Sequence, residues 1–170
     1  DRFAAAILME VMAGGFGSRL TEEIREKRGL TYGIYAYTLP LDEAQMVMGG
    51  VSTRNDKVAV TVGLVRAIWA EMALNGPTEE EVRDAKTYIN GSFPMRLTSS
   101  MPIAGLLVSL QRNERPIDYL DHRVERIDSV TMADLKRVAK RLFLADELSF
   151  VVVGQPKGLT PTAPAPEPRS

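Results

Sequence analysis

The sequence contains no cysteine and only one histidine, His122, among its 170 residues. Without cysteine, disulfide bonds, thiolate zinc sites and cysteine nucleophiles are all excluded. A single histidine and the lack of a Gly-x-Ser-x-Gly motif also leave too few groups for a serine-type catalytic triad. The chain therefore lacks the usual side chains for nucleophilic catalysis of its own.

The chain also lacks an excess of charge and a long apolar run. Its 21 Lys and Arg residues are balanced by 22 Asp and Glu residues, so no nucleic-acid partner is expected. No apolar run approaches the roughly 20 residues that cross a bilayer, and no signal peptide opens the sequence, so no membrane span is expected. The first residues already have a helical pattern and no initiator methionine, which indicates a fragment of a longer product.

Proline is concentrated at the C-terminal end. Residues 156–170 hold five of the ten prolines and almost no apolar bulk, which predicts a disordered tail. The chain as a whole is 45% hydrophobic, which is enough to bury the core of one domain. We place that domain at residues 1–155.

Hydrophobic periodicity predicts a mainly helical domain with a few strands. Helices are expected over about 3–12, 19–28, 58–76, 79–93, 100–113, 116–128 and 132–143. Aromatic and branched residues at 30–39 and 44–53 predict an antiparallel hairpin connected by Pro-Leu-Asp-Glu, and the apolar run 148–154 predicts a further buried strand. These elements indicate an α+β fold of two layers, with helices covering a mostly antiparallel sheet.

Capping residues support several of these helices. Ser18 is expected to cap the second helix at its start and Gly29 to end it in a left-handed conformation. Thr78 with Glu81 has the spacing of a capping box, and Thr131 is expected to cap the last helix.

One group of residues has the spacing of metal ligands. Asp118, Asp121, His122 and Glu125 are separated by three or four positions, which would place them on one helical face. All four come from one segment, however, and Arg126 stands where a second ligand would be expected. A solvated charged helix is therefore the favoured interpretation over metal binding.

Arg25 and Tyr32 stand seven positions apart across a predicted helix-to-strand turn. In the simpler interpretation Arg25 is a favourable charge at a helix C-terminus and Tyr32 is an ordinary strand aromatic. In the functional interpretation one turn presents a cation and a phenol to the same space. Such a pair could hold a peptide carbonyl and donate a hydrogen bond to an oxyanion.

The stretch "GGFGSRLTEEIREKRGLTYGIYAY" at 14–37 resembles the signature of the C-terminal domain of the pitrilysin/insulysin family of zinc metallopeptidases, which includes mitochondrial processing peptidase. Resemblance extends over about residues 3–154. It implies a clam of two halves that closes over a peptide, in which this half carries an Arg-Tyr pair. Arg25 would then contact the substrate backbone and Tyr32 would stabilise the tetrahedral intermediate, while Gly14, Gly15 and Gly17 match a substrate-contacting glycine loop.

The sequence departs from the family in one respect: it contains no H-x-x-E-H motif. The resemblance therefore implies that zinc comes from a partner domain or subunit of the same family, and that this chain alone does not hydrolyse its peptide substrate. A noncatalytic scaffold or binding subunit of the same fold stays open as an alternative, as does an independent metalloenzyme that uses His122. Resemblance to bacterial members also suggests a periplasmic or secreted location.

Overall fold

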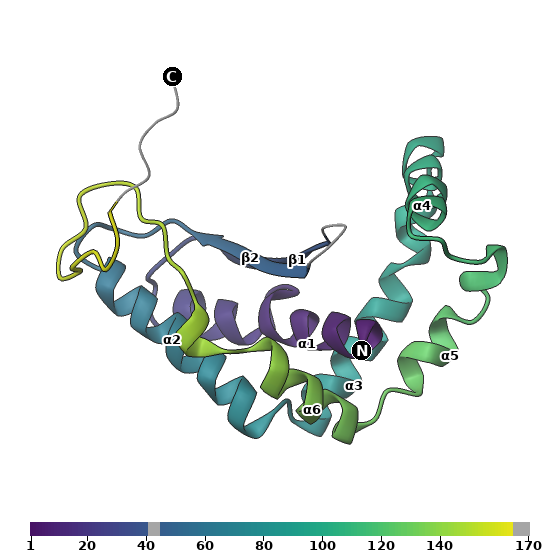
Figure 1. Ribbon diagram of the computed structural model, residues 1–170, viewed down its shortest axis with the longest axis horizontal. Coiled ribbons are helices and arrows are strands. Elements are labelled where there is room, and N and C mark those ends of the chain that lie inside the picture. Colours follow the sequence, from purple (N-terminus) through teal and green to yellow (C-terminus); the bar gives the residue numbers. More distant parts are fainter. Residues whose placement is uncertain (41–44, 165–170) are drawn as a thin grey trace.

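The computed structural model describes residues 1–40 and 45–164. The elements are α1 Arg2–Ala13, a π-helix at Thr21–Glu26, β1 Ile34–Pro40, β2 Gln45–Val51, α2 Val58–Asn75, α3 Glu79–Ser92, a 3₁₀ turn at Pro94–Leu97, α4 Ser100–Arg112, a 3₁₀ turn at Ile117–Tyr119, α5 Arg123–Asp128, α6 Met132–Leu142 and a 3₁₀ turn at Ala145–Glu147. Helices lie on one side of a hairpin, and α4 projects away from them (Figure 1). The predicted α+β fold is confirmed.

Helix α1 lies at the centre of the core. Its buried residues recur at the spacing of one helical face, because Ala4, Ile7, Leu8 and Val11 all face the interior. The helix packs against β1, α3, α5 and α6. Its predicted end is confirmed at Gly14, whose amide donates to the Glu10 carbonyl at 2.8 Å.

The two strands form the predicted antiparallel hairpin, with Ile34 opposite Val51 and Pro40 opposite Gln45. Alternation places Ile34 and Ala36 toward the core. The other face has an apolar and aromatic surface that stays exposed, formed by Tyr35, Tyr37, Met46 and Met48. Most of the predicted connection at 40–43 lies outside the described residues.

Helices α2, α3 and α6 follow the sequence closely because local signals fix their ends. Both capping boxes form, since the side chains of Thr78 and Thr131 accept hydrogen bonds from backbone amides three residues later. Trp69 of α2 meets Phe143, just beyond α6, edge to face with ring centres 4.9 Å apart. This contact joins the two helices beneath α1.

The predicted helix at 116–128 is wrong as a single element. A 3₁₀ turn at Ile117–Tyr119 and the short helix α5 replace it. Tyr119 is buried and stacks on Phe3 of α1, with ring centres 6.3 Å apart. The helix is interrupted where Tyr119 is buried, because tertiary packing outweighs helix propensity in a short segment.

The predicted strand at 148–154 is also wrong, because the segment pairs with no strand in the part of the chain that is described. Arg66 of α2 donates to the carbonyls of Ala145 and Leu148, each at 3.0 Å, and lies 5.1 Å from the centre of the Phe150 ring. The segment is thus held against α2. Local β-propensity cannot form a strand where no neighbouring strand satisfies the backbone.

One described helix, α2, is long and apolar enough to cross a membrane by length and composition alone. Several of its side chains belong to the core, among them Ile68, Trp69 and Met72. A core helix of a folded domain passes the same test, so this finding is weak evidence for a span.

Candidate functional site

The glycine loop begins where α1 ends. Gly15 has φ +154°, a conformation that favours glycine. A Cβ on Gly14 would overlap the Glu10 side chain. These backbone demands turn the chain sharply and leave the Phe16 side chain exposed at the tip of the loop.

Arg25 lies in the π-helix, where an α-helix capped by Ser18 was expected. The Ser18 hydroxyl instead donates to the Gly15 carbonyl at 2.7 Å and lies 3.0 Å from the Thr21 hydroxyl. Three residues beyond the end of the π-helix, Gly29 has φ +58° and its amide donates to the Arg25 carbonyl at 2.9 Å, so the predicted left-handed conformation of Gly29 is confirmed. π-Helical turns are rare in proteins, and those that occur are often found at functional sites.

The Arg25 side chain reaches back to the glycine loop. Its guanidinium carbon lies 4.9 Å from the centre of the Phe16 ring, and its Nε lies 3.3 Å from a Glu26 carboxylate oxygen. The side chain keeps 36% of its surface exposed. The fold therefore brings Arg25 and the loop of Gly14, Gly15 and Gly17 together.

Tyr32 lies on the bend just before β1 and is 98% exposed. The buried Thr31 holds this bend: its hydroxyl accepts from the Gly33 amide at 3.1 Å and lies 2.8 Å from the Gly33 carbonyl and 2.7 Å from the Ser52 carbonyl. Thr53 adds a hydrogen bond to the Leu30 carbonyl at 2.6 Å. A firmly anchored turn thus carries a phenol that points away from the domain.

Arg25 and Tyr32 are both accessible, but no contact joins them among the described residues. Sequence reasoning missed two residues that position this pair: Thr31, which holds the bend of Tyr32, and Phe16, whose ring contacts Arg25. The Gly-Leu-Thr-Tyr order was a signal for Thr31, because a threonine before a turn often hydrogen-bonds to nearby backbone.

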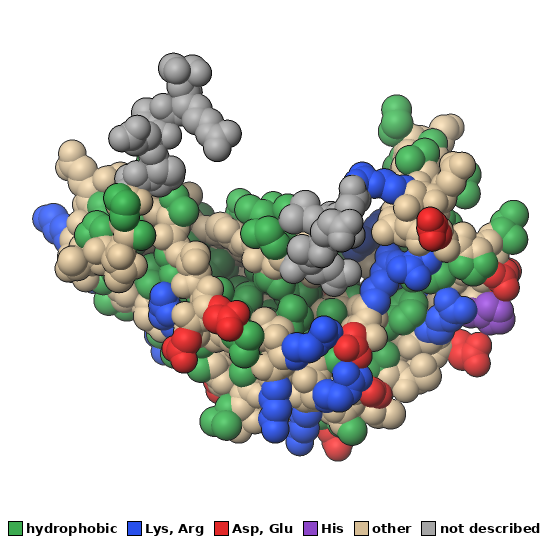
Figure 2. Space-filling view, viewed as in Figure 1, with side chains coloured by type: hydrophobic (Ala, Val, Ile, Leu, Met, Phe, Trp, Pro, Cys, Tyr) green, Lys and Arg blue, Asp and Glu red, His purple; other side chains and the backbone are tan. Residues whose placement is uncertain are grey.

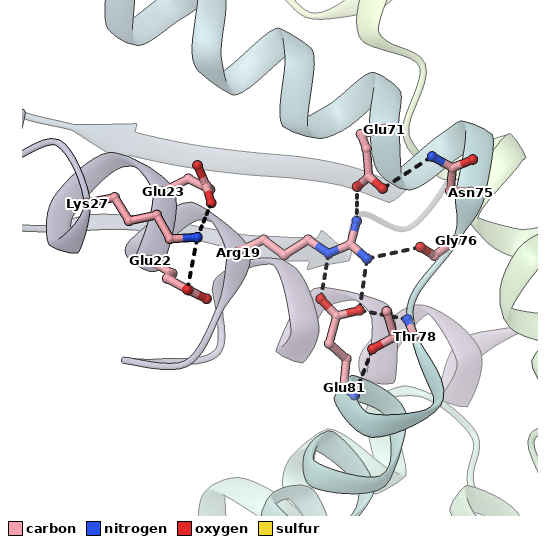
Figure 3. Close-up of polar contacts among 9 residues, drawn as sticks. All are labelled: Arg19, Glu22, Glu23, Lys27, Glu71, Asn75, Gly76, Thr78 and Glu81. Carbon is pink, nitrogen blue, oxygen red and sulfur yellow. Dashed lines mark hydrogen bonds and ion pairs between the residues drawn. The ribbon is translucent and has the colours of Figure 1, made fainter.

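Sequence reasoning also missed the role of Arg19, which begins the helical segment leading to Arg25. Its guanidinium donates to both carboxylate oxygens of Glu81, at 2.6 and 2.8 Å, to the Gly76 carbonyl at 3.0 Å and to Glu71 (Figure 3). The side chain is only 14% exposed. Arg19 therefore fastens the segment that carries Arg25 to the corner between α2 and α3.

Protonation of Glu81 should weaken this attachment. Burial raises the pKa of Glu81, but hydrogen bonds from Arg19 and the Thr78 amide more than offset it, so the pKa lies below its ordinary value of 4.5. A carboxyl whose pKa is lower in the folded than in the unfolded protein stabilises the fold at pH values above its unfolded-state pKa. That stability is lost as the pH falls through the folded-state pKa. We expect the free energy of unfolding to decrease below about pH 4.5.

Urea denaturation at pH 6, 4.5 and 3.5 measures this decrease. In an Arg19→Met variant the carboxyl keeps its burial but loses its main charged donor, so less stability remains to be lost in acid. An equal acid loss in both proteins would show that the pair does not set the pKa of Glu81.

The metal-ligand candidates lie around the break before α5. His122 Nε2 is 3.8 Å from Asp118 and its Nδ1 is 3.6 Å from Glu125, and all three side chains are exposed. No group of three or more His, Cys, Asp or Glu residues in the described ranges could hold a metal ion.

Comparison with known families gives one profile match. The family described as "Peptidase M16 inactive domain" matches residues 1–89, more than half of the 170-residue chain. The match includes the glycine loop, Arg25 and Tyr32.

Several proteins resemble the chain over most of its length. A protein named "Non-peptidase homolog YmxG" from Helicobacter pylori is 27% identical over 92% of this chain and 36% of its own length. An uncharacterized zinc protease from Mycobacterium leprae is 28% identical over 83% of this chain and 32% of its own length. The chain thus spans about a third of the length of the relatives it matches.

Solved structures agree in fold. A peptidase M16 inactive domain from Pseudomonas fluorescens has a TM-score of 0.76 and 33% identity, covering 86% of this chain and 35% of that chain. A protease from Helicobacter pylori has a TM-score of 0.73 and 22% identity, covering 84% of this chain and 34% of its own.

Proposed function

Because the chain belongs to the peptidase M16 inactive domain family, we propose that it is the non-zinc half of a peptidase and supplies Arg25 and Tyr32 to a zinc site carried by another domain or subunit. The family description names an inactive domain of a peptidase, and several relatives are named zinc proteases. The zinc half would bind and activate the attacking water through its own ligands and general base. We also propose that this domain ends near residue 155.

The exposure of Tyr32 is the observation that carries this proposal. The exposed Tyr32 side chain gains no stability from core packing. The backbone bend that carries it is nevertheless fixed by hydrogen bonds from Thr31 and Thr53. A fixed phenol can donate to a developing oxyanion without reorganising. The Arg25 guanidinium, held at the glycine loop, can donate to a peptide carbonyl.

The hairpin supports an extended peptide as the substrate. Its outer face, with Tyr35, Tyr37, Met46 and Met48, is exposed, and each described strand has one edge without a partner. Extended peptides bind such edges through main-chain hydrogen bonds.

A reconstitution assay tests the proposal. The chain alone should not hydrolyse unfolded peptides, with or without added zinc. Adding the zinc-bearing half should give hydrolysis that a chelator abolishes. If the zinc half is equally active without this chain, the chain does not complete the site.

The name of the Helicobacter relative favours a second candidate, a noncatalytic binding or scaffold subunit. In that case the assembled complex would bind unfolded peptides without cleaving them. Fluorescence anisotropy of a labelled peptide, followed by mass spectrometry of the same sample, separates binding from cleavage.

A further inference from the structure

A cavity lies between α1, α3, α4 and α5, and no residue of the glycine loop lines it. It has a volume of about 190 Å³. Its walls are mostly apolar and aromatic, including Phe3, Phe93, Leu110 and Tyr119. A dry cavity of about 150 Å³ holds benzene, so this one has room for a ring-sized group and a small polar head.

Arginine side chains surround this cavity. Arg2 and Arg115 line it, and their guanidinium carbons lie 5.6 and 5.8 Å from the centre of the Tyr119 ring. Arg126 lies 5.5 Å from the same ring. Basic side chains gather between α4 and α5 on this face (Figure 2). Four positive charges, with that of Arg123, therefore meet in one region.

Arg123 has a buried donor that lacks a hydrogen-bond partner, which indicates a ligand site. Its guanidinium lies 4.2 Å from the Phe93 ring and lines the cavity. One nitrogen, Nη2, donates to the Ile89 carbonyl at 3.4 Å, whereas Nη1 is buried without a hydrogen-bond partner in the described structure. Burial lowers the pKa of Arg123, Tyr119 opposes that effect, and positive Arg96 adds to it. A guanidinium remains charged in a protein, so this donor is costly to leave unpaired.

None of these arginines (Arg2, Arg115, Arg123 and Arg126) forms an ion pair with a carboxylate among those found in the described residues. Asp1 pairs instead with Arg137 and Arg141 of α6. Glu125 faces His122, and Asp128 accepts from Asn90. The unpartnered Nη1 of Arg123 is therefore a donor that an anion from outside the chain can accept from.

We propose that this cavity binds a monocarboxylate that carries an apolar or aromatic body, with the carboxylate on Arg123 and the body against Phe93 and Tyr119. A monocarboxylate with an apolar body fits better than a phosphate dianion, because the walls are mostly apolar and aromatic and a second charge would be costly to desolvate against them. Both a free small acid and the C-terminus of a peptide have this chemistry. The site is separate from Arg25 and Tyr32, and it does not depend on the proposed peptidase role.

Isothermal titration with N-acetylphenylalanine tests the site on the full chain. N-acetylphenylalanine amide, which lacks the charge, should bind about 10- to 100-fold more weakly, since a hydrogen bond between charged groups makes a difference of this size. Inorganic phosphate tests the dianion. A short peptide ending in phenylalanine, compared with its amidated form, separates a peptide C-terminus from a free acid.

Two variants locate the binding. Arg123→Met removes the donor and should weaken N-acetylphenylalanine at least about tenfold. Ala6→Leu keeps every charge but fills part of the cavity, and it should weaken binding as well. Arg54→Met, which removes an exposed arginine paired with Asp56, should change nothing. Thermal melts of each variant report folding.

Equal affinity for the acid and its amide, or unchanged binding in a folded Ala6→Leu variant, would overturn the proposal. Tighter binding of phosphate than of N-acetylphenylalanine would overturn the choice of a carboxylate. The binding measurements do not use the peptidase activity, so a failure of the reconstitution assay would leave this proposal intact.

Discussion

Replacing Tyr32 by phenylalanine in the reconstituted enzyme should lower kcat by about 10- to 1000-fold and change KM by no more than about threefold. The phenol would donate to an oxyanion that exists only after water attacks the peptide carbonyl. An interaction made only in the transition state affects kcat and leaves ground-state binding nearly unchanged. The expected split between kcat and KM follows from that role.

The exposed position of Tyr32 makes this variant informative. The side chain is 98% exposed, so phenylalanine removes no packing and no internal hydrogen bond. Tyr88→Phe, at an exposed tyrosine on α3, is the matched control and should keep wild-type kcat. Unchanged turnover of Tyr32→Phe would remove Tyr32 from the mechanism.

Thr31→Val separates the phenol from the bend that carries it. The substitution nearly preserves volume but removes the hydroxyl that connects Gly33 and Ser52. Tyr32 would keep its hydroxyl but lose its fixed position, so kcat should fall less than in Tyr32→Phe. Combining both changes should add little to Tyr32→Phe alone, because the two residues act through one group.

Elements with strong local signals could be predicted from the sequence. The helices at 58–76 and 79–93 have clear periodicity and a capping box, and the hairpin has aromatic and branched strands. The apolar run 148–154 has similar β-propensity but forms no strand. Whether a strand forms depends on a neighbour and on competing contacts such as those of Arg66, and neither is encoded within the run itself.

The candidate site divides in the same way. Arg25 and Tyr32 were found because their spacing resembles a known signature, and Gly29 was found because a helix end favours glycine. The π-turn was missed, since its residues have the same apolar pattern as an α-helix. The partner of Arg19 could not be predicted either, because Glu81 lies 62 residues away. The capping box with Thr78 already explained the presence of a glutamate at position 81.

Arg19→Met should produce the largest loss of stability, about 2–3 kcal/mol, which corresponds to a melting temperature lower by about 5–10 °C. Breaking a fully buried ion pair costs about 3–5 kcal/mol. The expected loss here is smaller because the Glu71 and Glu81 side chains are 48% and 27% exposed. Lysine should rescue only part of it, since one ammonium cannot reproduce the two parallel bonds to Glu81.

Arg83→Met is the matched control for Arg19. Arg83 also pairs with two carboxylates, Glu80 and Asp84, but its side chain is 67% exposed, so its loss should cost less than about 0.5 kcal/mol. Urea denaturation of both variants gives the comparison. Similar small losses would mean that the Arg19 contacts contribute no more than a surface ion pair.

A double-mutant cycle with Glu81→Gln isolates the pair. Glutamine keeps an oxygen that can accept the Thr78 amide, so the helix cap survives while the charge is lost. In the double variant position 81 carries no carboxylate that has lost its guanidinium, so the combined loss should fall short of the sum of the single losses by at least about 1 kcal/mol. Additive losses would instead show that Arg19 stabilises the domain through Gly76 and Glu71. In either case it is Arg19, two residues before the π-helix that carries Arg25, whose side chain joins this segment to α2 and α3.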